Sequence, residues 1–103
     1  RSESFKERRD FVVNSLNNIS GLSCVKPNGA FYVFPNCKKL LGKKTKLKND
    51  QEFVQKLLEK SQVAVVQGSA FGLDGYFRIS YATSMENLKK AIERIKSFCE
   101  SLN

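Results

Sequence analysis

The segment 76–81 constrains the fold more than any other part of the chain, because apolar and polar side chains alternate along it. Phe77, Ile79 and Tyr81 take every second position, and Arg78 lies between the first two of them. Successive side chains of a β-strand point to opposite faces of the sheet. The pattern therefore predicts a strand that turns its apolar residues toward the core and presents Arg78 on the opposite face.

Three other segments carry apolar residues at the spacing of an amphipathic helix. The first spans 4–19 and is followed by Gly21, a residue that commonly ends helices. The second spans 49–61 and starts with an Asn-Asp pair that can cap a helix. The third spans 83–102 and opens with a Thr-Ser-Met-Glu sequence that fits a capping box starting at Thr83.

Short runs rich in apolar and β-branched residues predict further strands at 22–25, 30–34 and 63–66. The run 30–34 is apolar throughout, so we expect it to be buried on both faces. A helical turn is expected at 37–41. The order α–β–β–α–β–β–α predicts an α/β fold of the two-layer α+β kind, with helices on a small sheet of about three or four strands. We expect residues 1–103 to form a single domain, because a chain of this length has room for one core.

The residue types argue against several kinds of site. The chain has no His, and its three Cys include no C-x-x-C pair. These are poor materials for a zinc site or a disulfide framework, and they fit the reducing cytoplasm. No apolar run approaches the roughly 20 residues of a membrane helix, so we expect no membrane partner.

A basic cluster accounts for much of the net charge of +8. A cluster of this kind can attract the phosphates of a nucleic acid. The other interpretation is a solvated loop, which is favoured because only leucines and no aromatic residues are interleaved with the lysines. We therefore expect no nucleic-acid partner, although a stand-alone basic α/β domain that binds nucleic acid or an acidic partner is the alternative function. The cluster consists of Lys38, Lys39, Lys43, Lys44, Lys46 and Lys48.

Arg78 is the candidate binding residue. An arginine in the middle of a strand is costly to desolvate unless an anion meets it. Its planar guanidinium can hold a carboxylate with two parallel hydrogen bonds. The residues alone leave a second interpretation open, in which Arg78 lies on an edge strand in water or pairs with a carboxylate of the same domain.

Two other motifs are weaker candidates. The glycine-rich stretch 68–75 lacks the G-K-[ST] ending of a phosphate-binding loop and is followed by a strand, so it does not fit a nucleotide site. The aromatic residues Phe31, Tyr32 and Phe34 could stack on bases, but the residues before them do not fit the RNA-recognition strand signature. We interpret these aromatic residues as part of the core.

Several segments resemble motifs of one family in order and spacing. The segment 27–35, PNGAFYVFP, resembles the P-x-G-A-F-Y-x-F-P strand of class I pyridoxal-phosphate aminotransferases, and 63–72, VAVVQGSAFG, is similar to their V-A-V-V-P-G-S-A-F-G stretch. The segment 77–82, FRISYA, resembles their x-R-[IL]-S-[YF]-A strand, and 93–95 resembles part of their last helix. The resemblance covers essentially all of the chain, and it is greatest to bacterial-type aspartate aminotransferases.

The resemblance implies the small C-terminal domain of a fold-type I aminotransferase, which transfers an amino group between an amino acid such as aspartate and a 2-oxo acid such as 2-oxoglutarate. It implies that Arg78 binds the α-carboxylate of the substrate. Pyridoxal phosphate and its catalytic lysine would belong to a large N-terminal domain of a homodimeric enzyme, so no catalytic or cofactor-binding residue is expected in this chain, which would be inactive alone. Gln67 departs from the motif, where proline is usual.

Overall fold

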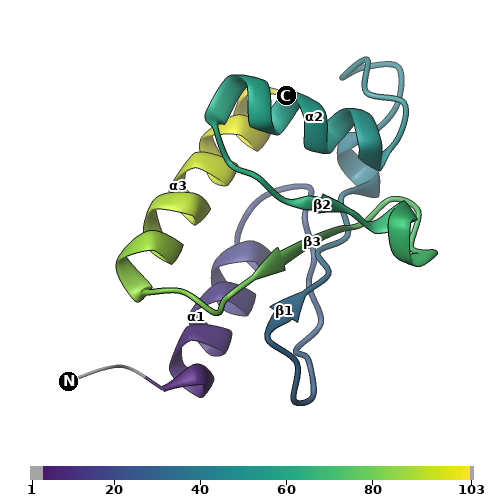
Figure 1. Cartoon of the computed structure of the whole chain (residues 1–103). Helices are drawn as coiled ribbons and strands as arrows, with labels where there is room; N and C mark the ends of the chain where they lie inside the picture. The colour runs from purple at the N-terminus through teal and green to yellow at the C-terminus, as the bar shows by residue number, and fades with distance from the viewer. Residues whose placement is uncertain (1–3, 103) are drawn as a thin grey trace.

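The computed structural model describes residues 4–102 and contains three α-helices and a three-stranded sheet (Figure 1). This confirms the predicted α/β class. The elements in chain order are α1 (Phe5–Asn17), β1 (Tyr32–Val33), the 3-10 turn η1 (Lys38–Leu40), α2 (Asp50–Ser61), β2 (Val66–Gln67), the 3-10 turn η2 (Gly68–Phe71), β3 (Phe77–Ser80) and α3 (Met85–Ser101).

Helices α1 and α2 begin at residues whose side chains cap the first turn. The Ser4 hydroxyl accepts the Glu7 N–H at 3.2 Å, while the Glu7 carboxylate accepts the Ser4 N–H at 2.9 Å, which completes a capping box. The Asn49 side chain accepts the Glu52 N–H at 2.9 Å. Each cap satisfies N–H groups that have no partner within the helix. The predicted start of the second helix is therefore confirmed.

Helix α3 begins one residue later than its sequence pattern predicts. Its N-cap is Ser84, whose hydroxyl accepts the Asn87 N–H at 3.1 Å. Thr83 lies outside the helix and its hydroxyl accepts the Asn87 side-chain amide at 3.2 Å. The predicted capping box starting at Thr83 is thus wrong, because Ser84 is the residue whose extended backbone brings its hydroxyl to the third helical N–H.

Strand β3 is the centre of the sheet. The strand order is β1-β3-β2, and both pairs are antiparallel. Ile79 lies opposite Val33 of β1, and Arg78 lies opposite Val66 of β2. Directly opposed residues of an antiparallel pair share a face, so Ile79 and Val33 face the core together, and Arg78 and Val66 face away from it.

The core lies between the sheet and the helices. The Phe53 ring of α2 stacks on the Phe77 ring of β3 at a centroid distance of 5.3 Å. The same ring meets Phe98 of α3 edge-on at 5.4 Å. All three rings are buried, as is Leu16 of α1. The helices therefore cover one face of the sheet, and the described residues leave the face that carries Arg78 uncovered (Figure 1).

The first strands differ most from their predictions. Residues 22–25 form no strand but a single bridge from Ser23 to Asn36, so the order α–β–β–α–β–β–α loses its first strand. Strand β1 is shorter than the predicted 30–34 and is not buried on both faces. Val33 is 1% exposed, but Tyr32, which points to the opposite face, is 38% exposed. The reason is that only one face of β1 meets the helices.

Two other boundaries shift by a few residues. The first helix ends at Asn17, two residues before the predicted Ile19, and Gly21 follows with φ of 96°. The predicted strand 63–66 pairs with β3 only from Val66, because the chain leaves α2 through Gln62 in a left-handed conformation and crosses to the sheet over the next three residues. The helical turn predicted at 37–41 is confirmed as η1.

Candidate functional site

Arg78 lies in the middle of β3 on the face away from the core, as its sequence position predicts. Its neighbours Phe77 and Ile79 are buried against the helices, while Arg78 is only half-buried. The strand is the central one of the sheet. The interpretation that placed Arg78 on an edge strand is therefore wrong.

Two aromatic rings flank the Arg78 guanidinium. Its central carbon Cζ lies 4.7 Å from the centroid of the Tyr32 ring and 4.6 Å from that of the Phe71 ring. These distances are typical of cation–π contacts, in which the cation lies over the face of a ring. The N–H donors of a guanidinium point outward within its plane, where they remain available to a planar acceptor.

No acceptor within the described part of the chain takes up those donors. The ion pairs of residues 4–102 involve other side chains, and none of the hydrogen bonds among these residues uses the Arg78 side chain. The alternative in which Arg78 pairs with a carboxylate of its own domain is therefore wrong for these residues. A half-buried guanidinium with fixed faces and unused donors is suited to binding a carboxylate.

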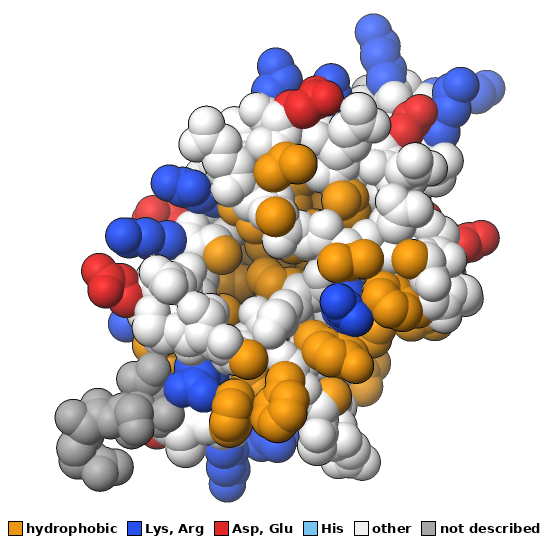
Figure 2. All heavy atoms as spheres, in the orientation of Figure 1, with side chains coloured by type: hydrophobic (Ala, Val, Ile, Leu, Met, Phe, Trp, Pro, Cys, Tyr) orange, Lys and Arg blue, Asp and Glu red, His pale blue; other side chains and the backbone are white. Residues whose placement is uncertain are grey.

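The aromatic residues beside Arg78 form an exposed surface and not part of the core. Phe34 contacts both Tyr32 and Phe71 edge-on, at 5.9 and 5.7 Å between ring centroids. Tyr32 is 38% exposed and Phe71 is 47% exposed. Figure 2 shows apolar side chains gathered on this side of the molecule, with basic side chains among them. The core interpretation of Phe31 and Tyr32 is wrong. Tyr32 lies on the uncovered face of the sheet, while Phe31 precedes β1 and packs on the exposed Phe5 ring at 4.8 Å.

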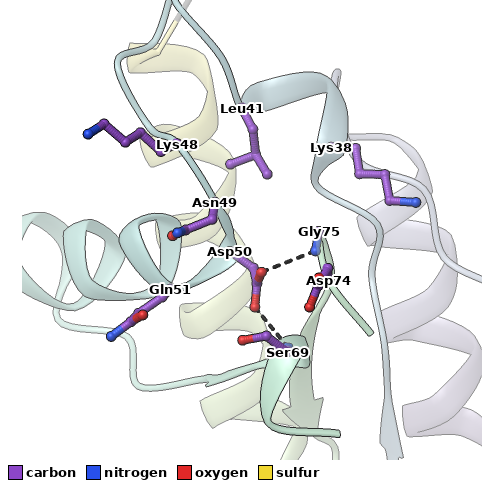
Figure 3. Close-up of a pocket in the computed structure, with 9 residues that line it drawn as sticks. All are labelled: Lys38, Leu41, Lys48, Asn49, Asp50, Gln51, Ser69, Asp74 and Gly75. Carbon is purple, nitrogen blue, oxygen red and sulfur yellow. Dashed lines mark hydrogen bonds between the residues drawn. The ribbon is translucent and has the colours of Figure 1, made fainter. Parts of the chain in front are cut away.

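Asp50 is a residue that the sequence analysis missed. It is the first residue of α2 and is only 2% exposed. Its carboxylate accepts the Ser69 N–H at 2.9 Å and the Gly75 N–H at 3.1 Å (Figure 3). Burial by itself raises the pKa of Asp50, but the hydrogen bonds from Ser69 and Gly75 outweigh it and hold the pKa below the ordinary value of a carboxyl group.

The loop 68–75, which Asp50 holds, is closely packed on itself. The Leu73 N–H donates to the Gly68 carbonyl at 2.9 Å, and the Gly68 N–H donates to the Tyr76 carbonyl at 2.7 Å. A Cβ on Gly68 would lie 2.3 Å from the Leu73 carbonyl oxygen and 2.6 Å from that of Tyr76. The glycine is thus required for close backbone approach and not for binding a nucleotide.

A hollow of about 540 Å³ lies beside Asp50 and is lined by Lys38, Lys48 and Asp74 among others (Figure 3). The amino groups of both lysines point away from Asp50. The Asp50 carboxylate is already used by backbone N–H groups. The hollow therefore offers no converging set of polar groups to a cofactor or a metal ion.

The lysines of the basic cluster are exposed, and they lie in η1 and in the loop between η1 and α2. Among residues 4–102 its lysines make no ion pair, and its one ring contact places the Lys38 amino group 5.2 Å from the centroid of Tyr76. A surface that binds single-stranded nucleic acid usually presents several aromatic rings. The arrangement therefore favours the interpretation of a solvated loop.

The three cysteines are buried and form no disulfide with one another. Burial raises the pKa of Cys24 to about 11 and, as the main cause, raises those of Cys37 and Cys99 to about 12. Thiols of this kind pack as small apolar groups and are not nucleophiles at neutral pH.

Within residues 4–102 no helix is both long enough and apolar enough to cross a bilayer.

Comparisons with known proteins relate the whole chain to one family. The family model for "Aminotransferase class I and II" matches residues 1–95. An aspartate aminotransferase of Rhizobium meliloti (strain 1021) is 55% identical across the whole chain, which covers 26% of that protein. A probable aspartate/prephenate aminotransferase of Rickettsia typhi (strain ATCC VR-144 / Wilmington) is 50% identical over 96% of the chain and 26% of its own length.

Solved structures agree with the sequence relatives. The crystal structure of the aspartate aminotransferase from Rhizobium meliloti matches 93% of this chain and 25% of its own, with a TM-score of 0.89 at 55% identity. An alanine aminotransferase from Pyrococcus furiosus matches 94% of this chain and 24% of its own, with a TM-score of 0.85 at 40% identity. The chain spans about a quarter of the length of these relatives.

Proposed function

The chain belongs to the class I and II aminotransferase family, and on that premise we propose that it is the small domain of an aspartate aminotransferase-like enzyme that binds the substrate's α-carboxylate through Arg78. The observation that carries the proposal is the guanidinium held between the rings of Tyr32 and Phe71 without an acceptor among residues 4–102. Two parallel N–H···O bonds from this group would fix the orientation of a bound amino acid as well as increase its affinity.

The reaction proposed for the whole enzyme is transfer of an amino group from an amino acid such as aspartate to a 2-oxo acid such as 2-oxoglutarate. Pyridoxal phosphate, used in this family, supplies an electron sink when bound. The described residues do not fit this group, since the lysines beside the hollow point outward and the buried carboxylate is already used by backbone donors. The cofactor would therefore lie in a large domain outside this chain.

The remaining parts of the proposal follow from the same premise. The exposed aromatic surface around Arg78 would face the large domain, and substrate binding would bring the two domains together and exclude water. We propose a homodimeric enzyme in the cytoplasm, a compartment that suits three cysteines that form no disulfide with one another. The isolated chain would have no transaminase activity even with added pyridoxal phosphate.

The experiment that tests the function is steady-state kinetics on the full-length enzyme carrying Arg78→Ala or Arg78→Lys. Arg78→Ala is expected to lower kcat/KM by about 100-fold for aspartate and for a neutral amino acid alike, because both contain the α-carboxylate. Lys restores the charge but not the paired geometry, so Arg78→Lys should recover only part of the loss.

Arg94→Ala is the matched control, since Arg94 is an exposed arginine of α3 without an ion pair to any described residue. Its kcat/KM is expected to stay at the wild-type value. An Arg78→Ala enzyme whose kcat/KM equals that of Arg94→Ala would rule out the carboxylate site.

A further inference from the structure

Asp50 is the one buried charged side chain among residues 4–102, and it makes no ion pair with any of them. Its two carboxylate oxygens instead accept the backbone N–H groups of Ser69 and Gly75. Burying a carboxylate is costly unless it is hydrogen-bonded, and charge-assisted bonds from backbone N–H groups are strong ones. Outside α2 itself, the hydrogen bonds that compensate for the burial of Asp50 therefore all come from one loop.

The two donors lie near opposite ends of the loop 68–75, and Phe71 lies between them. Asp50 thus joins both ends of the loop to the first turn of α2 (Figure 3). The loop's own bond from Leu73 to Gly68 closes it at 2.9 Å. The position of Phe71 therefore depends on Asp50 of α2, and not only on the strand that carries Arg78.

The two rings that flank Arg78 are held differently. Tyr32 belongs to β1 and is fixed by its pairing with Ser80 of β3. Phe71 belongs to no strand, is half exposed, and contacts one other ring, that of Phe34. One of the two rings beside the guanidinium is therefore held by the sheet, while the other depends on the loop that Asp50 holds.

We infer that Asp50 is a positioning residue for carboxylate recognition, which acts through Ser69 and Gly75 to hold Phe71 against Arg78. This inference rests on the proposed function of Arg78. Ordering the ring in advance reduces the conformational freedom that the site loses when substrate binds, and it therefore improves binding without a contact between Asp50 and the substrate.

The test compares Asp50→Asn with Asp74→Asn in the full-length enzyme. The amide has the shape of the carboxylate but turns an NH₂ group toward one N–H donor, so one of the two bonds is lost. Asp74 lies in the same loop, is exposed, and makes no hydrogen bond or ion pair with residues 4–102. Asp50→Asn is expected to raise KM about twofold with little change in kcat, and Asp74→Asn is expected to leave both unchanged.

A double variant tests the route of the effect. If Asp50 acts through Phe71, Asp50→Asn should raise KM much less in a Phe71→Leu enzyme than in the wild type. Equal KM values for Asp50→Asn and Asp74→Asn, or fully additive effects of Asp50→Asn and Phe71→Leu, would overturn the inference. An effect of Arg78→Ala without one of Asp50→Asn would leave the proposed function standing, whereas no effect of Arg78→Ala would end both.

A measurement on the wild type covers the case in which Asp50→Asn does not fold. Succinate is a dicarboxylate that has no amino or keto group to react. Because coupling is reciprocal, binding of succinate should slow hydrogen exchange at the Ser69 and Gly75 amides by about twofold or more. The Lys46 amide donates to the Gly42 carbonyl in the loop between η1 and α2, and its exchange rate is the internal reference. Unchanged exchange at Ser69 and Gly75 in saturating succinate would overturn the inference.

Discussion

The Phe71 ring lies 4.6 Å from the guanidinium carbon of Arg78, although the two residues belong to different elements. The contact makes the loop 68–75 part of the surface around the proposed carboxylate site. It also gives this loop a role that its glycines alone do not indicate.

Replacing Phe71 by Leu should weaken substrate binding. The change removes the aromatic face beside Arg78 and keeps an apolar side chain. We expect KM to rise about threefold, which corresponds to the free energy of one exposed cation–π contact, with little change in kcat. Phe31→Leu is the matched control, because Phe31 is equally exposed but packs on Phe5 at 4.8 Å. Steady-state kinetics with aspartate measures both, and an equal KM for the two variants would contradict the prediction.

Gly68→Ala should destabilise the protein through backbone crowding. The added methyl would lie 2.3 Å from the Leu73 carbonyl oxygen, and a backbone atom cannot move aside as a flexible side chain can. We expect a loss of about 3 kcal/mol or more. Gly29→Ala serves as the comparison, since Gly29 has a positive φ but open space around it, and should cost about 1 kcal/mol. Urea unfolding of the full-length variants measures the difference, and an equal loss for both would contradict it.

Features that depend on neighbouring residues were predictable from the sequence. The alternation at Phe77, Arg78 and Ile79 correctly placed Arg78 away from the core, because a strand fixes side-chain direction locally. Helix α3 was predicted for the same reason, since its buried Leu88, Ile92, Ile95 and Cys99 repeat at helical spacing.

Features that depend on distant segments were not predictable. Phe31 and Tyr32 look like core residues in the sequence, but Tyr32 points to the face of the sheet that no helix covers, and Phe31 packs on the exposed ring of Phe5 and lies beside Tyr81. Asp50 follows a helix cap, where an acidic residue is ordinarily exposed and favourable to the helix dipole. Its burial depends on the return of the chain at Ser69 and Gly75, and no local pattern indicates that.

Asp50→Asn should also change how stability depends on pH. The pKa of Asp50 is lowered in the folded protein, so its carboxylate stabilises the fold above the ordinary carboxyl pKa of about 3.9. That contribution is lost as pH falls through the lower pKa of the folded state. The difference in urea midpoint between wild type and Asp50→Asn should therefore be largest near pH 7 and shrink below about pH 4.

Asp74→Asn is the control for this pH series and should follow the wild type throughout. Apart from Asp50 and Asp74, the carboxylates are the same in the three proteins, so their contributions cancel in the comparison. A difference between wild type and Asp50→Asn that stays constant from pH 7 to pH 3 would show that the Asp50 charge is not what stabilises the loop.

The buried thiols should resist alkylation in the native protein. Burial raises the pKa of Cys24 to about 11 and that of Cys37 to about 12, with the nearby Asp50 and Cys99 adding to the effect at Cys37. At pH 8 the thiolate fraction of Cys24 is then about a thousandth, against roughly a quarter for an ordinary exposed thiol.

Iodoacetamide labelling followed by peptide mass spectrometry should find Cys24, Cys37 and Cys99 unmodified in the native protein and fully modified in urea. Ser97→Cys, which puts a thiol on the exposed side of α3, should label rapidly under native conditions. Native labelling of Cys37 at the rate of that engineered thiol would contradict the burial of Cys37 near Asp50 and Cys99, since a thiol can react only when it is both ionised and reached by solvent.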